Sequence, residues 1–340
     1  MDKRPAQAYI QLMSNDLNVR FLDRTTPPHI FTLILIAGVS ALAMNIFLPS
    51  LPHMAGYFDT EYRIMQLSVP IYFVVNALLQ LVVGPVSDRF GRRPIVLGGM
   101  IIFTLASVGC AYAQTVELFL FYRMIQATVV VGIVLSRAIV RDIVGGPRSA
   151  SMIGYVTMGM AVVPMVGPAI GGMLDEVFGW QSNFLVLAGL GLITVIICFF
   201  DLKETATARS TSFADQFRQY PELLTSRRFW GYCLAAAFGS GAFFAYLGGA
   251  PYVGSELFHL TPAVLGYYFG APAVGYFAGN FITARFVSRF GINGLIVTGG
   301  CILVAGMALS LAVFYAGYGS ALVFFGLMTF IGLGNGLVMP

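Results

Sequence analysis

The residues of this chain that could do chemistry are few, and the most unusual of them is a cation inside an apolar segment. Arg123 stands there with Gln126 three residues later, which places both side chains on one face of a helix. An arginine buried in a membrane helix is costly and normally faces a cavity or a polar partner. The alternative is that its long side chain reaches the outer membrane surface. The buried arrangement predicts that Arg123 and Gln126 contact a small-molecule substrate or shift the pKa of a nearby acid.

Other polar side chains recur every four residues in a second apolar segment. Ser68, Tyr72, Asn76 and Gln80 therefore share roughly one face of a helix. Such a face either holds neighbouring helices together through hydrogen bonds or lines an aqueous path, and the spacing fits both. On the second interpretation, Tyr72 and Asn76 join the candidate substrate-binding residues.

Groupings typical of enzymes or metal sites are missing from the sequence. The three histidines fall near the ends of apolar segments without metal-ligand spacing, and the four cysteines lie inside such segments. No HExxH pair, phosphate-binding loop or dinucleotide-binding glycine pattern stands in a suitable context. No polar stretch is long enough for the nucleotide-binding domain of an ATP-driven pump. We therefore expect a protein that is not an enzyme and that needs no metal or cofactor.

The composition indicates which elements must position these residues. Of 340 residues, 58% are apolar and only 10% are charged, and the mean hydropathy is +0.82. Soluble domains carry roughly a quarter charged residues, and disordered chains are polar and poor in aromatics. The remaining class is an all-α, polytopic membrane protein. The net charge of +4 does not indicate nucleic acid binding, because no basic cluster with interleaved aromatics lies outside an apolar context.

Ten segments are long and apolar enough to cross a bilayer, which takes about 20 mostly apolar residues in a helix. They lie near residues 30–51, 66–87, 94–113, 116–136, 151–174, 180–200, 229–251, 262–284, 294–315 and 319–340. Of the 19 Lys and Arg residues, 17 fall in loops on the side of the N-terminus, while Arg63 falls opposite and Arg123 lies within a span. The positive-inside rule then predicts a cytoplasmic N-terminus.

A polar stretch separates the first six spans from the last four. We expect a cytoplasmic N-terminal segment over 1–29, a six-helix bundle over 30–200, a cytoplasmic linker over 201–228 and a C-terminal bundle over 229–340. The two bundles share a short repeat. The sequence Arg-Phe-Gly at 89–91, after the second span, returns at 289–291, after the eighth.

The loop after the second span carries the densest motif, GPVSDRFGRRP from Gly84 to Pro94. Gly84 permits close helix approach and Gly91 permits a tight turn. We expect Asp88 and Arg92 to serve as a charge-paired latch. If the basic residues only obeyed the positive-inside rule, the aspartate and the glycines would stay unexplained. The motif resembles the cytoplasmic loop signature of the major facilitator superfamily. The candidate cytoplasmic gate comprises Gly84, Asp88, Arg89, Gly91, Arg92, Arg93, Arg141 and Asp142.

The fifth span resembles the fifth-helix signature of antiporters in that superfamily, although Val163 stands where the signature has another glycine. Small residues at four-residue spacing let helices pack closely, and proline weakens the backbone ladder, so we expect a flexible helix. The alternative is that glycine is simply common in membrane helices. The residues concerned are Gly154, Pro164, Gly167, Pro168, Gly171 and Gly172.

Two further segments resemble the Bcr/CflA multidrug branch: MNIFLPSLP at 44–52 and SRAIVRD at 136–142, which also makes Asp142 a plausible partner for Arg92. Members of that branch often have aspartate at the position of Asn45, and this acid is thought to carry the coupling proton. Asparagine cannot titrate. Either an acid near a helix end replaces it, with Glu117 and Asp175 as the nearest candidates, or coupling is absent or different.

The resemblance implies a major facilitator fold of two six-helix bundles, of which ten of twelve expected helices are present. It implies a monomeric secondary active transporter in the bacterial inner membrane, with a small-molecule substrate, protons and the lipid bilayer as partners and no nucleic acid. Export of drug-like or amphipathic compounds by proton antiport, with alternating access, is the expected function. The alternatives are an importer or uniporter of a small polar metabolite, and a non-transporting receptor or scaffold of the same fold.

Overall fold

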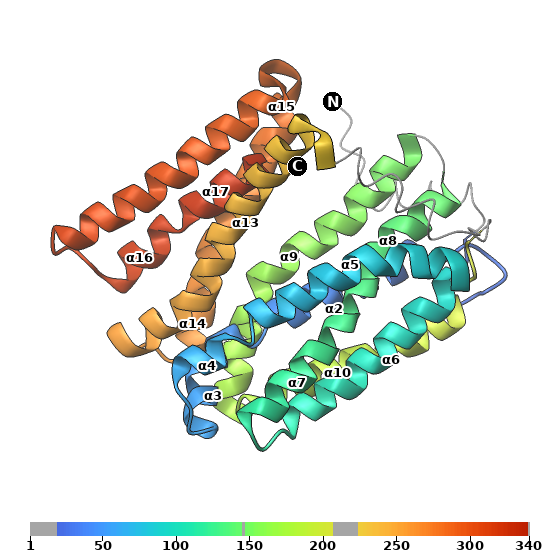
Figure 1. The fold of residues 1–340 in the computed structure, drawn as a ribbon, viewed down its shortest axis with the longest axis horizontal. Helices are drawn as coiled ribbons and strands as arrows, with labels where there is room; N and C mark the ends of the chain where they lie inside the picture. The colour runs from blue at the N-terminus through green and yellow to red at the C-terminus, as the bar shows by residue number, and fades with distance from the viewer. Residues whose placement is uncertain (1–18, 145–146, 207–223, 339–340) are drawn as a thin grey trace. The chain divides into compact units, whose positions relative to one another are not determined.

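A computed structural model describes residues 19–144, 147–206 and 224–338 of the chain (Figure 1). Within that part every regular element is helical and no strand occurs, as the composition predicts. The described residues form two compact units. The first lies within Met1–Ala43, Pro70–Met160 and Phe184–Phe213, and the second within Met44–Val69, Ala161–Asn183 and Ala214–Pro340.

The first unit is built from helices of the N-terminal half. They are α2 (Ile30–Asn45), α5 (Pro70–Phe90), α6 (Arg92–Ala111), α7 (Val116–Gln126), the short η2 (Ala127–Val129), α8 (Val130–Ile143), the beginning of α9 (Pro147–Phe178) and most of α10 (Gln181–Asp201). Helix α6 packs against α7 and α8, and α5 packs against α8. Apolar side chains such as Met100, Phe103 and Leu135 are fully buried between them.

The second unit combines the C-terminal helices with segments 44–69 and 161–183. Its elements are η1 (Leu48–Ser50), α3 (Leu51–Tyr57), α4 (Tyr62–Gln66), the end of α9, α13 (Arg227–Tyr252), the π-turn η3 (Val253–Leu257), α14 (Pro262–Tyr268), α15 (Gly270–Tyr315), α16 (Ala321–Leu327) and α17 (Thr329–Val338). Helix α17 packs against α15 and α13, and η1 packs against α13 and α14. The expected bundles 30–200 and 229–340 stay a prediction.

Eight helical stretches of the described residues are long and apolar enough to cross a membrane. They coincide with eight of the ten expected spans. Helix α9 occupies the expected span 151–174, and α14 with the first part of α15 occupies 262–284. Several helices continue past the expected spans: α5 ends at Phe90, and the helical stretch from Val116 ends at Ile143.

Four of these helices begin at a hydroxyl side chain that accepts a hydrogen bond from a backbone N–H of the first turn. Such caps satisfy donors that the start of a helix leaves without a partner. The capping residues are Thr115 for α7, Ser226 for α13, Thr261 for α14 and Ser320 for α16.

The Arg-Phe-Gly repeat has the same backbone feature in both halves. Gly91, between α5 and α6, has φ 101°, and Gly291, at a kink inside α15, has φ 69°. Positive φ values in this range favour glycine because it has no Cβ. The tight turn expected at Gly91 is therefore present, and the match 200 residues later marks an equivalent turn.

Candidate substrate and gating sites

Arg123 lies in α7 and is only 1% exposed, so its side chain does not reach the surface. The guanidinium donates a hydrogen bond through Nη1 to Oε1 of Gln126. Gln126 in turn donates through Nε2 to Oγ of Ser107 on α6, at 2.8 Å. The guanidinium also lies over the ring of Tyr72 on α5, with its Cζ 4.0 Å from the ring centroid. The structure thus brings three helices together around one buried cation.

The polar face of α5 continues this cluster. Tyr72 and Asn76 are buried, and Nε2 of Gln80 donates to Oδ1 of Asn76 at 2.6 Å. Ser68 is also buried, but it precedes α5 and belongs to the second unit, so it is not part of this helix face; Gln80 in α5 lies at an exposed position. The polar face of α5 therefore runs from the buried Tyr72 and Asn76 to the exposed Gln80.

Asn45, the last residue of α2, is buried and belongs to the second unit, whereas Arg123 and Tyr72 belong to the first. The two acids considered in its place differ in their surroundings. Glu117 is exposed, whereas Asp175, near the end of α9, is 3% exposed. Nδ1 of His53 on α3 lies 3.3 Å from the carboxylate of Asp175. Asp175 is therefore the acid that the structure places in a buried, partnered site.

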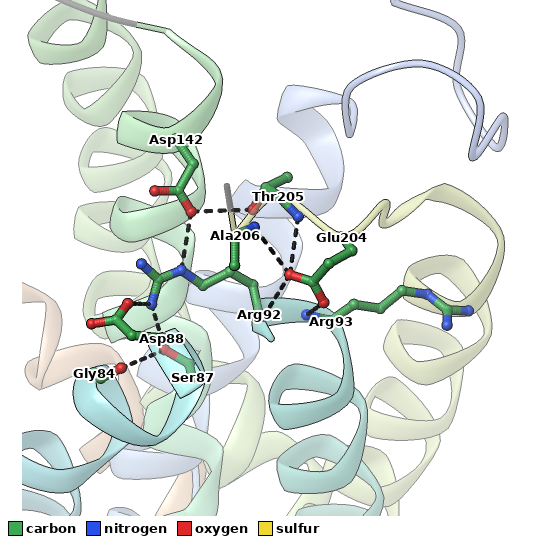
Figure 2. A network of polar contacts seen from close by, with 9 residues as sticks. All are labelled: Gly84, Ser87, Asp88, Arg92, Arg93, Asp142, Glu204, Thr205 and Ala206. Atoms are coloured by element: carbon green, nitrogen blue, oxygen red, sulfur yellow. Dashed lines mark hydrogen bonds and ion pairs between the residues drawn. The ribbon is translucent and has the colours of Figure 1, made fainter. Parts of the chain in front are cut away.

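The charged residues of the expected latch form a compact network at the meeting point of α5, α6 and α8 (Figure 2). Arg92 Nη1 lies 2.5 Å from Asp88 Oδ1, and Arg92 Nε donates to Asp142 Oδ2 at 3.0 Å. Arg92 also donates to Oγ of Ser87, which donates to the carbonyl of Gly84 at 2.7 Å. The Arg92–Asp142 pair suggested by the sequence is present, and all these groups belong to the first unit.

Glu204, just after α10, completes this network and was not among the expected gate residues. Its carboxylate accepts hydrogen bonds from the backbone N–H of Arg92 at 2.8 Å and of Arg93 at 3.3 Å. It also accepts from the N–H of Thr205, whose hydroxyl donates to Asp142 at 3.2 Å. A carboxylate at this position caps the start of α6 and complements its helix dipole. In the sequence, Glu204 is only an acid shortly after a span, and its spacing to other residues forms no motif.

Four other residues of the candidate gate have different surroundings. The close helix approach expected at Gly84 is not seen, because a Cβ at this position would meet no atom within 4 Å. Arg89 and Arg141 are exposed. The side chain of Arg93 points away from Glu204 in Figure 2, although its backbone N–H binds that carboxylate.

Helix α9 packs closely at its last two candidate glycines. A Cβ on Gly171 would overlap the backbone carbonyl of Ile46, and one on Gly172 would overlap that of Pro262 at the start of α14. Gly266 of α14 fits against the carbonyl of Pro168 in the same way. These contacts lie within the second unit. Gly167 is buried, while the surroundings of Gly154 and Pro164 lie outside what the structure describes.

Asp201, the last residue of α10, is a second acid that sequence analysis missed. Its buried carboxylate accepts hydrogen bonds from the backbone N–H of Leu22 at 2.8 Å and of His29 at 2.9 Å. It also accepts one from the hydroxyl of Thr32 at 2.7 Å. Asp201 thus fixes the segment before α2 to the end of α10.

Comparison with known proteins identifies similar chains among bacterial transporters. The chain is 34% identical over 262 residues to the uncharacterized MFS-type transporter YdgK of Bacillus subtilis, covering 75% of this chain and 65% of that protein. It is 32% identical over 306 residues to a chloramphenicol resistance protein of Pseudomonas aeruginosa, covering 87% and 71%. It is 27% identical over 274 residues to a bicyclomycin resistance protein homolog of Haemophilus influenzae, covering 78% and 68%. The chain thus spans about two thirds of the length of these relatives.

Solved structures of transporters share the fold. A D-xylose-proton symporter superposes with a TM-score of 0.73 at 15% sequence identity, over 91% of this chain and 80% of the symporter. Residues 33–340 match the sequence profile of the Major Facilitator Superfamily. These residues include the loop motif, the fifth-helix signature and the Arg123 cluster described above. The chain therefore belongs to the major facilitator superfamily, as its sequence motifs predict.

Proposed function

We propose that the protein exports drug-like or amphipathic organic compounds across the bacterial inner membrane by proton antiport and alternating access. The observation that carries the proposal is the polar cluster around Arg123, buried among apolar helices of a superfamily transporter. Polar and ionisable groups in that environment are costly and mark substrate or ion pathways. The names of two relatives, for resistance to chloramphenicol and bicyclomycin, support organic antibiotics as the compound class.

In this proposal Arg123 and Gln126 bind polar oxygens of the substrate. The guanidinium offers several fixed donors, and the amide of Gln126 offers both a donor and an acceptor. The ring of Tyr72, which already stacks on the guanidinium, gives the same place an apolar surface. An apolar site with few polar groups suits varied organic solutes.

Coupling to protons is assigned to a residue other than Asn45. Asp175 is the proposed proton-binding acid, because it is a buried carboxylic acid that contacts a titratable histidine. Helix α9 carries both this acid and the glycines that pack against Ile46 and Pro262. A change of protonation at Asp175 would thus act on a helix that has to move when access alternates.

The network of Asp88, Arg92, Asp142 and Glu204 is the proposed cytoplasmic gate. It ties α5, α6 and α8 to the first residues of the linker. Rocking of one bundle against the other requires that each bundle moves as a unit. The network keeps the cytoplasmic ends of these helices together, and we infer that it stabilises the state closed to the cytoplasm.

The test is uptake of radiolabelled chloramphenicol into proteoliposomes that hold the protein under an imposed pH gradient. Proton antiport predicts faster uptake when the lumen is acidic than when it is alkaline, and a protonophore should abolish the difference. Equal uptake under both gradients would identify a uniporter, and the opposite preference would identify a symporter. No uptake of chloramphenicol or of other cationic, neutral and anionic test compounds would favour a receptor or scaffold.

A further inference from the structure

The adjacent arginines at the start of α6 point in different directions. Arg92 turns into the gate network, where Asp88 and Asp142 neutralise its charge. The Arg93 side chain leaves that network, as Figure 2 shows, and its Nη2 donates to the backbone carbonyl of Phe199 on α10 at 3.2 Å. The gate therefore accounts for Arg92 and leaves the charge of Arg93 unexplained.

Phe199 ends an exposed apolar stripe of α10. Phe199 is 46% exposed, and Ile196 and Leu192, one and two turns earlier on the same face, are similarly exposed. A helix that crosses a bilayer exposes such a face to lipid chains. Phe199 is two residues before the end of α10, and the residues that follow are expected in the cytoplasm. The ring therefore lies where the lipid chains meet the headgroups of the cytoplasmic leaflet.

Two arginines stack on this one ring. The guanidinium carbon of Arg24 is 4.6 Å from the centroid of Phe199, and that of Arg93 is 5.3 Å from it. The two residues come from segments 69 positions apart. Arg24 is held in place because Asp201 binds the N–H groups of Leu22 and His29 on either side of it. The fold thus brings two cations together at a lipid-facing position.

No carboxylate of the described residues forms an ion pair with either arginine. Nε of Arg93 is buried and has no hydrogen-bond partner among those residues. Two like charges beside one ring repel each other, a buried donor without an acceptor has a cost of its own, and a neighbouring anion offsets both. The planar guanidinium group of arginine presents N–H donors at a spacing that matches the oxygens of a phosphate group. An anion of that kind therefore suits this site.

We propose that Arg24, Arg93 and Phe199 bind the phosphate of an anionic phospholipid in the cytoplasmic leaflet. The phosphate lies against the two guanidinium groups, and an acyl chain runs along Leu192 and Ile196. A lipid fits better than free phosphate because the cations adjoin an exposed apolar stripe rather than a polar cleft. Basic sites beside membrane helices on the cytoplasmic side are suited to such headgroups. This lipid site is independent of the transported substrate and of proton coupling.

The test is native mass spectrometry of the purified protein titrated with phosphatidylglycerol, and with phosphatidylcholine as the zwitterionic comparison. The double variant Arg24→Gln, Arg93→Gln should bind phosphatidylglycerol roughly tenfold more weakly or worse, since each basic residue near a membrane surface contributes about tenfold or somewhat less to anionic lipid binding. Arg24→Gln alone should give part of that loss, and it changes an exposed residue before the first helix. Phosphatidylcholine binding should not change.

Arg289→Gln is the matched control, because Arg289 is the one arginine of the described residues that stacks on Phe290, at 5.8 Å, on the expected cytoplasmic side. Unchanged phosphatidylglycerol binding in this variant, with the loss in the double variant, supports the site. An equal loss in Arg289→Gln would show that net charge alone matters, and no loss in either arginine variant would also overturn the proposal. Displacement of the lipid by inorganic phosphate would identify a free-phosphate site instead.

Discussion

At the scale of single residues, Gln126 connects the buried cation to its neighbours. We expect Gln126→Leu to lower stability by about 1.5–3 kcal/mol, because it removes a hydrogen bond to a charged group inside the bundle. Ser107→Ala removes only a neutral acceptor from the same chain of bonds and should cost about 0.5–1.5 kcal/mol. Thermal unfolding of the two variants in detergent shows which of them loses more stability. Equal losses would mean that Gln126 does not stabilise Arg123.

The gate network gives a second prediction at this scale. Asp88→Asn removes the charge that faces Arg92, so α5 and α6 should separate more readily at their cytoplasmic ends. A cysteine introduced at Gln80, two turns earlier on α5, should then react faster with maleimide added from the cytoplasmic side. Arg141→Gln, which removes an exposed charge next to Asp142, is the control and should leave the rate unchanged. Unchanged labelling in Asp88→Asn would contradict the proposed gate.

Residue spacing predicted some of these contacts and missed others for a physical reason. Arg123 and Gln126 are three positions apart on one helix, so their contact follows from helix geometry. Arg92 and Asp142 lie on different helices, yet both stand in motifs that the family resemblance brings together. Glu204 and Asp201 bind backbone N–H groups more than 100 positions away, and any acid near a helix end would look the same in sequence.

At the scale of elements, the turn between α5 and α6 depends on Gly91. Its positive φ disfavours any side chain, and a Cβ would overlap the carboxylate of Glu204. Gly91→Ala should therefore lower stability by about 1–3 kcal/mol. Gly98→Ala, inside α6 with open space around it, should be neutral or stabilise by up to about 1 kcal/mol. Similar melting temperatures for the two variants would show that the turn tolerates a side chain.

The contact between α9 and α14 gives a prediction about movement. Gly172→Ala should force these helices apart, because the added Cβ would overlap the carbonyl of Pro262. If closure of the outer side requires this contact, chloramphenicol uptake should fall several-fold while the protein stays in the membrane. Gly189→Ala on α10, which meets no atom within 4 Å, is the control. Full activity in Gly172→Ala would exclude α9–α14 packing from the transport cycle.

The length of each apolar segment predicted where the helices lie, but it did not predict where they end. A bilayer fixes how many apolar residues a span needs, so hydropathy finds the part of the helix inside the lipid. The helical stretch from Val116 continues to Ile143, and α5 continues to Phe90, because polar residues extend a helix in water without an apolar signal. The gate residues Asp88 and Asp142 lie in these extensions. The sequence therefore located the gate by motif rather than by element boundary.

At the scale of the whole molecule, the charge distribution predicts one orientation in the membrane. With 17 of 19 basic residues assigned to one side, the positive-inside rule places that side in the cytoplasm. Exposed positions on opposite sides test this directly. In intact cells, a cysteine replacing Arg63 should react with a membrane-impermeant maleimide, and one replacing Lys203 should react only after permeabilisation. Native cysteines are first replaced in both variants.

The same experiment tests the gate and the lipid site, because both require that their residues face the cytoplasm. Lys203 follows Asp201 and precedes Glu204, so its side is also that of Arg24 and of the Arg92 network. Anionic headgroups of the cytoplasmic leaflet attract basic residues only if these residues face that leaflet. Labelling of the Lys203 position in intact cells would place the arginine pair outside and exclude it from that leaflet. Labelling of the Arg63 position alone supports the predicted orientation, and with it a cytoplasmic gate beside a site for anionic lipid.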